Sequence, residues 1–348
     1  MSRITVLGSG AWGTAIALSL SGKADHEVTL WSRSSETAEA LNHNRENLHF
    51  LPGFSFPDKL RVTTDEARAV SGSEILVCVA PSQFLRPTME RLALHLHPGQ
   101  ILVSATKGLE DDSLLRMTEV IESCVTEAGH TLPVGALSGP SFAQEVAAGM
   151  PTALTVAFAD PAVAAFVQKE FSSSTLRLYT NDDVIGVEMG GALKNVIAIS
   201  AGILAGLGLG LNSAAALITR GIAEITRLAV AAGGQRETLA GLSGVGDLVL
   251  TCTGALSRNR TVGFELGRGR KLPEILAGLD GKVAEGVRTT RAALGLARKL
   301  GVEMPITEQM GLILDEGKDP KAAIRELMLR PGRDEEDWPS KRSSTGRV

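Results

Sequence analysis

One lysine of this chain lies where an ammonium group could act as an acid or base. Lys194 is the only charged residue between Glu188 and Arg220, in a stretch of glycine, alanine, aliphatic and small polar residues. Loss of hydration there would lower the pKa of the ammonium group. Lysine can then exchange a proton, whereas arginine cannot. The alternative is a lysine at a helix end whose stem packs on apolar surface while its ammonium group reaches water.

Asp247 is a second isolated charge in the same half of the chain. It is the only charged residue between Glu237 and Arg258. Two opposite charges in apolar segments of one domain are expected to pair, because either one buried alone would cost several kcal/mol. The pair could serve acid/base chemistry, or it could be a purely structural ion pair.

A glycine-rich turn near the N-terminus has the spacing of a dinucleotide-binding site. It follows an apolar run at residues 4–8, opens a helical pattern, and consists of Gly8, Ser9, Gly10, Ala11, Trp12 and Gly13. Such glycines permit a tight turn, let the backbone approach a pyrophosphate and let the helix pack on the strand. The amide groups of the helix N-terminus then favour an anion.

Arg33 stands where such folds select the cofactor. The second β-rich run ends in Trp31-Ser32-Arg33-Ser34, and the first carboxylate after it is Glu36. An arginine there can pair with the 2′-phosphate of NADP, whereas an acidic residue would bind the ribose hydroxyl of NAD. The sequence therefore predicts binding of NADP(H) with possible use of NAD(H), unless Arg33 is only a solvated charge.

Three further segments could bind anions. Lys107 follows a predicted strand, at the edge where open α/β sheets bind ligands. Residues 138–145 are interpreted as a strand end, a turn and a helix start, in which Ser141 and Gln144 have the spacing of a capping box. Residues 257–260, Ser-Arg-Asn-Arg, taken alone are more typical of a solvated loop than of a phosphate clamp.

Composition excludes several classes of protein. The net charge of −4 argues against a nucleic-acid or anionic-membrane surface. The three cysteines form no CxxC pair, which suits a reducing cytoplasm, and no zinc-binding or other metal-binding pattern is present. The single tyrosine, Tyr179, is followed four residues later by Asp183, which excludes a YxxxK dehydrogenase. All six histidines lie at or before His130, so a site in the second half must use another base.

The order of elements predicts a Rossmann-like doubly wound α/β domain followed by an all-α domain. Short β-rich runs alternate with helical patterns over about the first 180 residues, which predicts βαβ units and a parallel sheet. The predicted strands span 4–8, 28–31, 75–79, 101–105, 134–138, 153–158 and 176–179. We expect a nucleotide-binding domain at 1–182, a helical substrate domain at 183–330 and a charged, disordered tail at 331–348. Glycines interrupt the long apolar stretch around Lys194, which favours core helices over a membrane span.

With these motifs in place, the chain resembles the bacterial NAD(P)-dependent glycerol-3-phosphate dehydrogenases. The similarity covers residues 1–330 in order. It runs through the motifs GSGAWGTA, SATKGL, SGPSFAQEV, GGALKNVIAI, GLSGVGDLVLTCTGALSRNR, VAEGV and MPITEQM. The GGALKN and GDLVLTC…LSRNR blocks are far more specific than a nucleotide-binding turn.

The resemblance implies a role for each motif residue. Lys194 would be the proton donor and acceptor, supported by Asp247, with Asn195 and Thr251 as polar residues beside the reacting carbon. The residues implied to contact the substrate are Lys107, Gly139, Ser141, Ser257, Arg258 and Asn259, with Arg258 and Asn259 on its phosphate. Besides the glycine turn, those implied to line the cofactor site are Ala11, Trp12, Arg33, Lys107, Ala143, Arg258, Val283 and Glu285.

The activity implied is reversible reduction of dihydroxyacetone phosphate to sn-glycerol 3-phosphate with NAD(P)H, for glycerophospholipid synthesis by a cytoplasmic homodimer. A second hypothesis is a β-hydroxyacid dehydrogenase of the 6-phosphogluconate type, but the GDLVLTC…SRNR block argues against it. A non-catalytic NADP(H)-binding sensor is the third possibility. It has no need of both Lys194 and Asp247 in uncharged surroundings.

Overall fold

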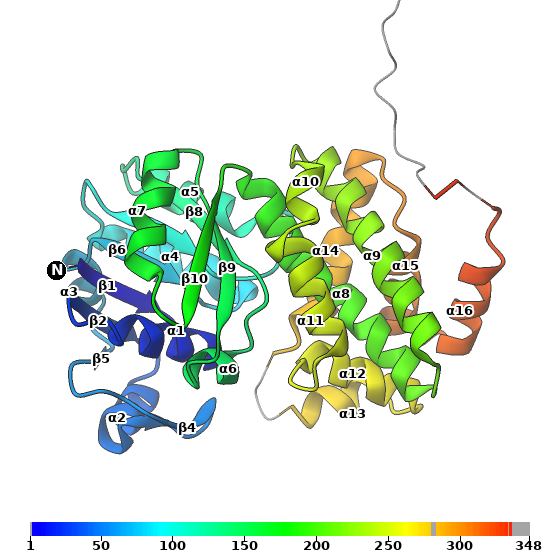
Figure 1. Ribbon diagram of the computed structural model, residues 1–348, viewed down its shortest axis with the longest axis horizontal. Helices are drawn as coiled ribbons and strands as arrows, with labels where there is room; N and C mark the ends of the chain where they lie inside the picture. Colours follow the sequence, from blue (N-terminus) through cyan, green and yellow to red (C-terminus); the bar gives the residue numbers. More distant parts are fainter. Residues whose placement is uncertain (1, 280–282, 333, 336–348) are drawn as a thin grey trace, which may run out of the picture.

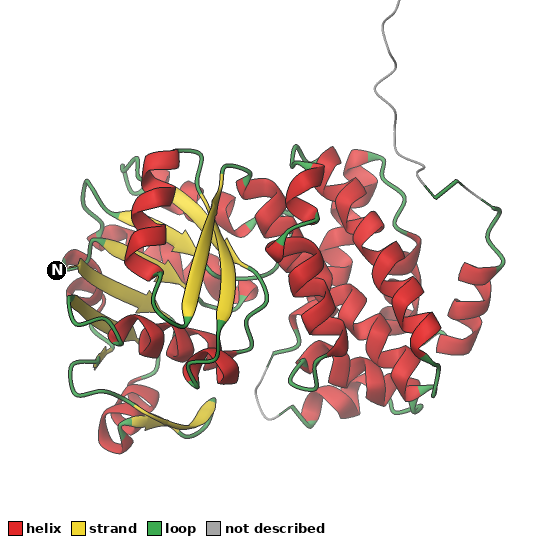
Figure 2. Ribbon diagram, viewed as in Figure 1, coloured by secondary structure: helices red, strands yellow, loops and turns green. Residues whose placement is uncertain are grey.

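The structure of the chain is a computed structural model that describes residues 2–279, 283–332 and 334–335. A sheet covered by helices forms the first half and a group of helices forms the second (Figure 1). Figure 2 shows all the strands gathered in the first of these regions. The predicted order of an α/β region followed by an all-α region is therefore confirmed. The tail predicted to be disordered at 331–348 lies outside the described residues except for 331–332 and 334–335.

The central sheet has eight strands in the order β10-β9-β8-β7-β6-β1-β2-β5. Its strands are β1 Ser2–Leu7, β2 His26–Trp31, β5 Arg61–Thr63, β6 Ile75–Cys78, β7 Ile101–Ser104, β8 Val134–Ser138, β9 Thr152–Ala157 and β10 Leu176–Asn181. From β5 to β8 all neighbours are parallel, and the order reverses between β1 and β6. This is the strand order of dinucleotide-binding sheets, which bind ligands beyond the carboxyl ends at the reversal.

The predicted parallel sheet includes one antiparallel pair at its far edge. β8 and β9 pair antiparallel, with Ser138 opposite Thr155, and β10 runs parallel to β9. A parallel pairing needs a crossover of a dozen or more residues, usually with a helix packed over the sheet. The link from β8 to β9, residues 139–151, is long enough for a crossover, but its short helix α6 (Ala143–Ala147) packs on α1 and the chain returns antiparallel beside β8.

Helices cover both faces of the sheet, as expected of a doubly wound fold. On one face α1 (Ala11–Ser21) and α7 (Pro161–Phe171) contribute to a core with the strands. On the other face lie α3 (Glu66–Ser71), α4 (Ser82–Leu92) and α5 (Met117–Glu127). A lobe of α2 (Ser35–Asn44) and the hairpin β3 (Glu46–Asn47) and β4 (Leu51–Ser55) follows β2; neither this hairpin nor β5 was predicted.

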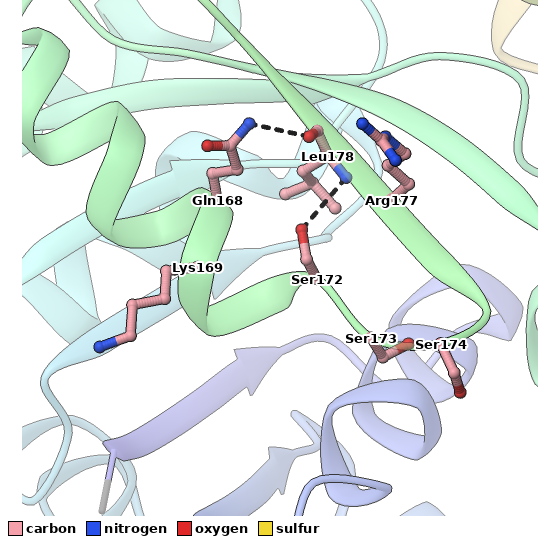
Figure 3. Close-up of a pocket in the computed structure, with 7 residues that line it drawn as sticks. All are labelled: Gln168, Lys169, Ser172, Ser173, Ser174, Arg177 and Leu178. Carbon is pink, nitrogen blue, oxygen red and sulfur yellow. Dashed lines mark hydrogen bonds between the residues drawn. The ribbon is translucent and has the colours of Figure 1, made fainter.

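The outer edge of β10 is covered by side chains from the end of α7. Leu178 N donates to Ser172 Oγ at 3.3 Å, and Leu178 O accepts from Gln168 Nε2 at 2.9 Å (Figure 3). Unpaired backbone groups on an edge strand invite pairing with another chain. These two contacts occupy the amide and carbonyl of Leu178 and so blunt the edge of the sheet.

The second half is built around α8 (Val184–Gly206), a long apolar helix whose residues are mostly buried. The surrounding helices are α9 Leu211–Ala231, α10 Arg236–Leu239, α11 Asp247–Thr253, α12 Arg258–Gly267, α13 Leu272–Ala277, α14 Glu285–Leu300, α15 Pro305–Glu316 and α16 Pro320–Met328. α8 is long and apolar enough to cross a membrane, but α9, α11, α12 and α14 pack against it. It is therefore a buried core helix, as the sequence predicts.

Glycines let α8 and α12 approach until their backbones touch. A Cβ atom on Gly202 would lie 2.0 Å from the carbonyl oxygen of Arg260, and one on Gly263 would lie 1.9 Å from that of Ile199. Neither position can hold a larger residue without separating the helices. α8 is also tied to α5, because the buried carboxylate of Glu188 accepts from Thr118 N at 2.8 Å. These contacts fix the helix that carries Lys194 relative to both halves of the chain.

Candidate active site

The glycine-rich turn joins β1 to α1 at the reversal of the strand order. Gly8 has a φ of +133°, a conformation that glycine adopts readily, and a Cβ on Gly13 would lie 1.9 Å from Gly8 O. Among the described residues, a Cβ on Gly10 would meet no atom within 4 Å, and no side chain caps the N-terminus of α1. The first two glycines of the turn therefore differ in their role, and the backbone around Gly10 is accessible to a phosphate group.

Arg33 lies at the end of β2, as predicted, and is exposed. Its guanidinium carbon is 5.0 Å from the ring centroid of Phe84, near the start of α4. Ser32 accepts a hydrogen bond from Ser9 Oγ at 2.9 Å, which joins the end of β2 to the glycine turn. No carboxylate occupies the position that would bind a ribose hydroxyl, so the residues present fit the NADP form of a dinucleotide as well as the NAD form.

Lys194 lies in the middle of α8 and not at a helix end, which overturns the alternative of an ammonium group reaching water there. Its side chain is 9% exposed. Nζ is 2.8 Å from Asp247 Oδ1 and donates to Thr251 Oγ1 at 2.7 Å. Thr251 in turn donates to the carbonyl oxygen of Asp247 at 2.6 Å. The predicted pairing of Lys194 with Asp247 is therefore confirmed as a contact.

Lys107 joins the same carboxylate from the sheet side. It follows β7 and its Nζ lies 2.7 Å from Asp247 Oδ2 and 3.1 Å from Gly139 O. The side chain of Asp247 is 1% exposed, so one buried carboxylate holds two ammonium groups. This arrangement leaves one surplus positive charge among the three side chains, which suits a phosphorylated or otherwise anionic substrate.

Burial and neighbouring charges shift the protonation equilibria of the cluster. Burial lowers the pKa of Lys194 from 10.5 to about 8; Asp247 opposes this shift and Lys107 adds to it. Burial raises the pKa of Glu285 from 4.5 to about 7, against the effect of Arg258 and the two lysines. A lysine with a pKa near 8 can both give and take a proton close to neutral pH.

A second hydrogen-bonded group lies one residue further along α8. Asn259 Nδ2 donates to Asn195 Oδ1 at 3.0 Å, and Asn259 Oδ1 accepts from Gly286 N at 3.0 Å. Asn259 therefore links α8, α12 and α14. Arg258 is exposed at the first position of α12, and its charge acts on Glu285, the first residue of α14.

Two interpretations of local structure are wrong. Residues 257–260, which alone favoured a solvated loop, begin α12: Ser257 accepts from Arg260 N at 3.2 Å as its N-cap, and Asn259 is buried. Ser141 does not cap α6, because the helix begins two residues later and Ser141 Oγ instead donates to Gly139 O at 3.0 Å. That carbonyl also binds Lys107, so Ser141 still belongs to the site.

The remaining predicted residues lie at the starts of helices, with Ala11 and Trp12 opening α1. Ala143 begins α6 and Val283 precedes α14; both are partly buried. Asn47 was missed by the sequence reasoning, although its Nδ2 donates to Ser9 O at 2.9 Å and to Thr14 Oγ1 at 2.8 Å, which props the glycine turn. No local pattern marks it. Among the described residues, no group of three or more His, Cys, Asp or Glu side chains is arranged to hold a metal ion.

A dinucleotide-binding sheet, followed by a helical region that buries a lysine–carboxylate pair beside it, defines a nicotinamide-nucleotide-dependent oxidoreductase. The sequence matches the NAD-dependent glycerol-3-phosphate dehydrogenase N-terminus over residues 3–164 and the C-terminus of the same family over residues 183–325. The chain belongs to this glycerol-3-phosphate dehydrogenase family.

Individual relatives span nearly the whole chain. A glycerol-3-phosphate dehydrogenase of Acidobacterium capsulatum is 61% identical, covering 96% of this chain and 100% of that protein. One of Koribacter versatilis is 58% identical over 95% of this chain and 98% of its own length. The crystal structure of glycerol-3-phosphate dehydrogenase from Coxiella burnetii superposes with a TM-score of 0.90 at 38% identity, covering 94% of this chain and 99% of that one.

Proposed function

We propose that Lys194 is the general acid and base of the glycerol-3-phosphate dehydrogenase reaction that this chain catalyses with NAD(P). The activity follows from membership of the family; the role of Lys194 rests on its contacts. The observation that carries it is the placement of Nζ in the middle of the mostly apolar helix α8, 2.8 Å from Asp247 Oδ1 and 2.7 Å from Thr251 Oγ1. Lysine, aspartate and threonine so arranged hold one ammonium group oriented and protonated before substrate arrives.

The reaction is the reversible reduction of dihydroxyacetone phosphate to sn-glycerol 3-phosphate. NAD(P)H held at the glycine turn would supply the hydride that reaches the carbonyl carbon. Lys194 Nζ supplies a proton to the oxygen that gains negative charge, and neutral Lys194 takes the hydroxyl proton in the reverse direction. Asp247 and Thr251 keep Nζ oriented, and Asn195 adds a polar group on the same helix.

The substrate phosphate is assigned to the cationic and amide groups at the start of α12. Arg258 and Asn259 bind it there, with Ser257 beside them, because a guanidinium group and an amide both donate to phosphate oxygens. Lys107, Gly139 and Ser141 lie on the sheet side, where they are joined through Gly139 O. Lys107 would contact the substrate through the third N–H group of its ammonium.

The cofactor site is assigned to the carboxyl edge of the sheet. The glycine turn, with Gly8, Gly10 and Gly13, would hold the pyrophosphate at the N-terminus of α1. Arg33 would bind the 2′-phosphate of NADP(H), while NAD(H) lacks that group. The other assigned residues are Ala11, Trp12, Lys107, Ala143, Arg258, Val283 and Glu285.

The larger organisation is part of the same proposal. Residues 1–182 would form the cofactor domain and residues 183–330 the substrate domain. The protein would act as a homodimer in the cytoplasm, with a mass in solution near twice that of the 36.5-kDa chain. Its product would serve glycerophospholipid synthesis, the role that the family implies.

The test compares wild-type protein with Lys194→Ala by following NADPH absorbance with dihydroxyacetone phosphate. The wild-type protein should oxidise NADPH, whereas kcat of the variant should be lower by about 10²-fold or more, because general acid catalysis typically raises the rate by about 10²- to 10⁴-fold. The variant should still bind NADPH. A near-normal kcat for Lys194→Ala would refute the acid/base role. Turnover of 6-phosphogluconate with NADP in place of dihydroxyacetone phosphate would favour the β-hydroxyacid alternative.

A further inference from the structure

Ser138, the last residue of β8, carries a buried hydroxyl group that has no hydrogen-bond partner. The residue is 4% exposed, and its Oγ makes no hydrogen bond within the described residues. Leaving a buried polar group unpaired costs free energy, so each such group in a folded protein calls for an explanation. Alanine would avoid that cost at this position.

The hydroxyl group of Ser138 sits against a notch in α8. A Cβ atom on Gly191 would lie 2.4 Å from Ser138 Oγ, while the next nearest atoms, Ser138 Cβ at 3.5 Å and Lys107 Cγ at 3.7 Å, are at ordinary contact distance. Alanine is preferred to glycine inside a helix, so helix formation does not account for glycine here. In its present rotamer, the hydroxyl group of Ser138 is the one atom that occupies the space a side chain at position 191 would fill.

This contact lies between the two lysines that share Asp247. Gly191 is three residues before Lys194 on α8, and helical side chains lean toward the N-terminus, so the stem of Lys194 extends over the turn that contains Gly191. On the other side, the residue after Ser138 is Gly139, whose carbonyl oxygen binds Lys107 Nζ at 3.1 Å. The end of β8 therefore holds one lysine and α8 holds the other.

We propose that Ser138 is a positioning residue whose hydroxyl group, seated against Gly191, acts as a spacer that sets the separation of Lys107 and Lys194 on the carboxylate of Asp247. The inference rests on the proposed acid/base role of Lys194. It explains why an unpaired hydroxyl group and a helical glycine occur together at this point. The group acts by its size, without touching the reacting atoms.

The separation of the lysines matters because each charge acts on the other. The groups that face Lys194 are Asp247 and Cys252 from α11, Lys107 from the segment after β7, and Glu285 from the start of α14. Of these, Lys107 lowers the pKa of Lys194. Moving the two lysines apart weakens this repulsion and raises the pKa of Lys194; moving them together lowers it.

The experiment is a double-mutant cycle with Gly191→Ala, Ser138→Ala and the combination of both. Gly191→Ala places a methyl group 2.4 Å from Ser138 Oγ, and a hydroxyl group that acts as a spacer should then push α8 away from β8. Its kcat should fall about 10-fold or more, since small displacements of catalytic groups are costly. The alkaline limb of its pH profile for reduction should also move to higher pH. Ser138→Ala should shift that limb in the opposite direction.

The double variant provides the decisive measurement. Its new methyl group replaces the lost hydroxyl group, a swap that nearly conserves volume. We therefore expect kcat to return to within about threefold of the wild-type value and the alkaline limb of the pH profile to return to its wild-type position. The control is Ser104→Ala, which removes another buried, unpaired hydroxyl group from the neighbouring strand β7 and should leave the profile unchanged.

Several outcomes would refute the proposed spacer role of Ser138. They are full activity of Gly191→Ala, no recovery in a folded double variant, or a shift in Ser104→Ala as large as that in Ser138→Ala. If Gly191→Ala does not fold, Ser138→Ala decides, and an unshifted profile refutes the proposal. Lys194→Ala distinguishes failure of the acid/base proposal from failure of the spacer proposal. Near-normal activity of Lys194→Ala would refute the acid/base role. An inactive Lys194→Ala together with a fully active Gly191→Ala would refute only the spacer role of Ser138.

Discussion

Lys107 and Lys194 share one carboxylate, with their ammonium nitrogens 2.7 and 2.8 Å from the two oxygens of Asp247. They arrive from opposite sides, Lys107 from the segment after β7 and Lys194 from the middle of α8. Two ammonium groups held this closely repel each other, and the buried carboxylate between them makes the arrangement stable. Asp247 is therefore the group on which both the geometry and the protonation of the cluster depend.

Asp247→Asn should slow reduction strongly while preserving the fold. The carboxylate raises the pKa of Lys194, so its loss lets the pKa fall below about 8, and less of the lysine is protonated at neutral pH. Asparagine also leaves one acceptor oxygen for two ammonium groups, and its NH₂ group faces the other lysine. We expect kcat/KM for dihydroxyacetone phosphate at pH 7 to fall about 10²-fold, measured by NADPH oxidation. Circular dichroism is the control for folding, and a folded variant with wild-type kcat/KM would contradict this role of Asp247.

The two directions of the reaction should respond oppositely to pH. Reduction needs protonated Lys194, so kcat/KM should be level at lower pH and fall as pH rises through about 8. Oxidation of sn-glycerol 3-phosphate needs neutral Lys194 and should rise through the same pH. Initial rates in both directions between about pH 6 and 10 test this. Residual activity of Lys194→Arg should lack the limb near pH 8, because arginine stays protonated there; a limb that persists belongs to another group.

The contact between Lys194 and Asp247 could be predicted from the sequence, but the other contacts of the cluster could not. Lys194 and Asp247 are conspicuous because each is the only charge in an apolar segment, and this isolation predicts their contact. Lys107 has no such signature toward Asp247, which lies 140 residues away, so only the folded chain brings them together. In the same way, the antiparallel direction of β9 follows from the path of the link through α6, which packs on α1, and the β-rich pattern of β9 does not indicate its direction. Asn47 props the glycine turn through side-chain contacts that no local pattern reveals.

Arg33→Asp should reverse the preference between the two cofactors. Arginine can pair with the 2′-phosphate of NADPH, whereas aspartate repels it and can accept from the ribose hydroxyl of NADH. Hydrogen bonds to charged groups contribute roughly 1.5–3 kcal/mol, so kcat/KM with NADPH should fall by about 10- to 100-fold. The value with NADH should be unchanged or higher. Arg33→Ala serves as the matched control, since it removes the attraction without adding repulsion and should lie between the two. Equal losses with both cofactors would mean that Arg33 supports the local fold through Phe84 instead.

Two glycines of the same turn should fail in different ways when replaced by alanine. A Cβ on Gly13 would lie 1.9 Å from the carbonyl oxygen of Gly8, so Gly13→Ala must shift α1 against β1. Overpacking of this kind costs about 1–3 kcal/mol, which should appear as a lower midpoint in thermal or urea unfolding without any cofactor present. A Cβ on Gly10 meets no protein atom within 4 Å, so Gly10→Ala should unfold at the wild-type midpoint. Its methyl group would instead occupy the approach to the N-terminus of α1 and weaken NADPH binding, measured by fluorescence titration. Gly10→Ala with unchanged NADPH affinity would show that the pyrophosphate does not approach the backbone at this residue.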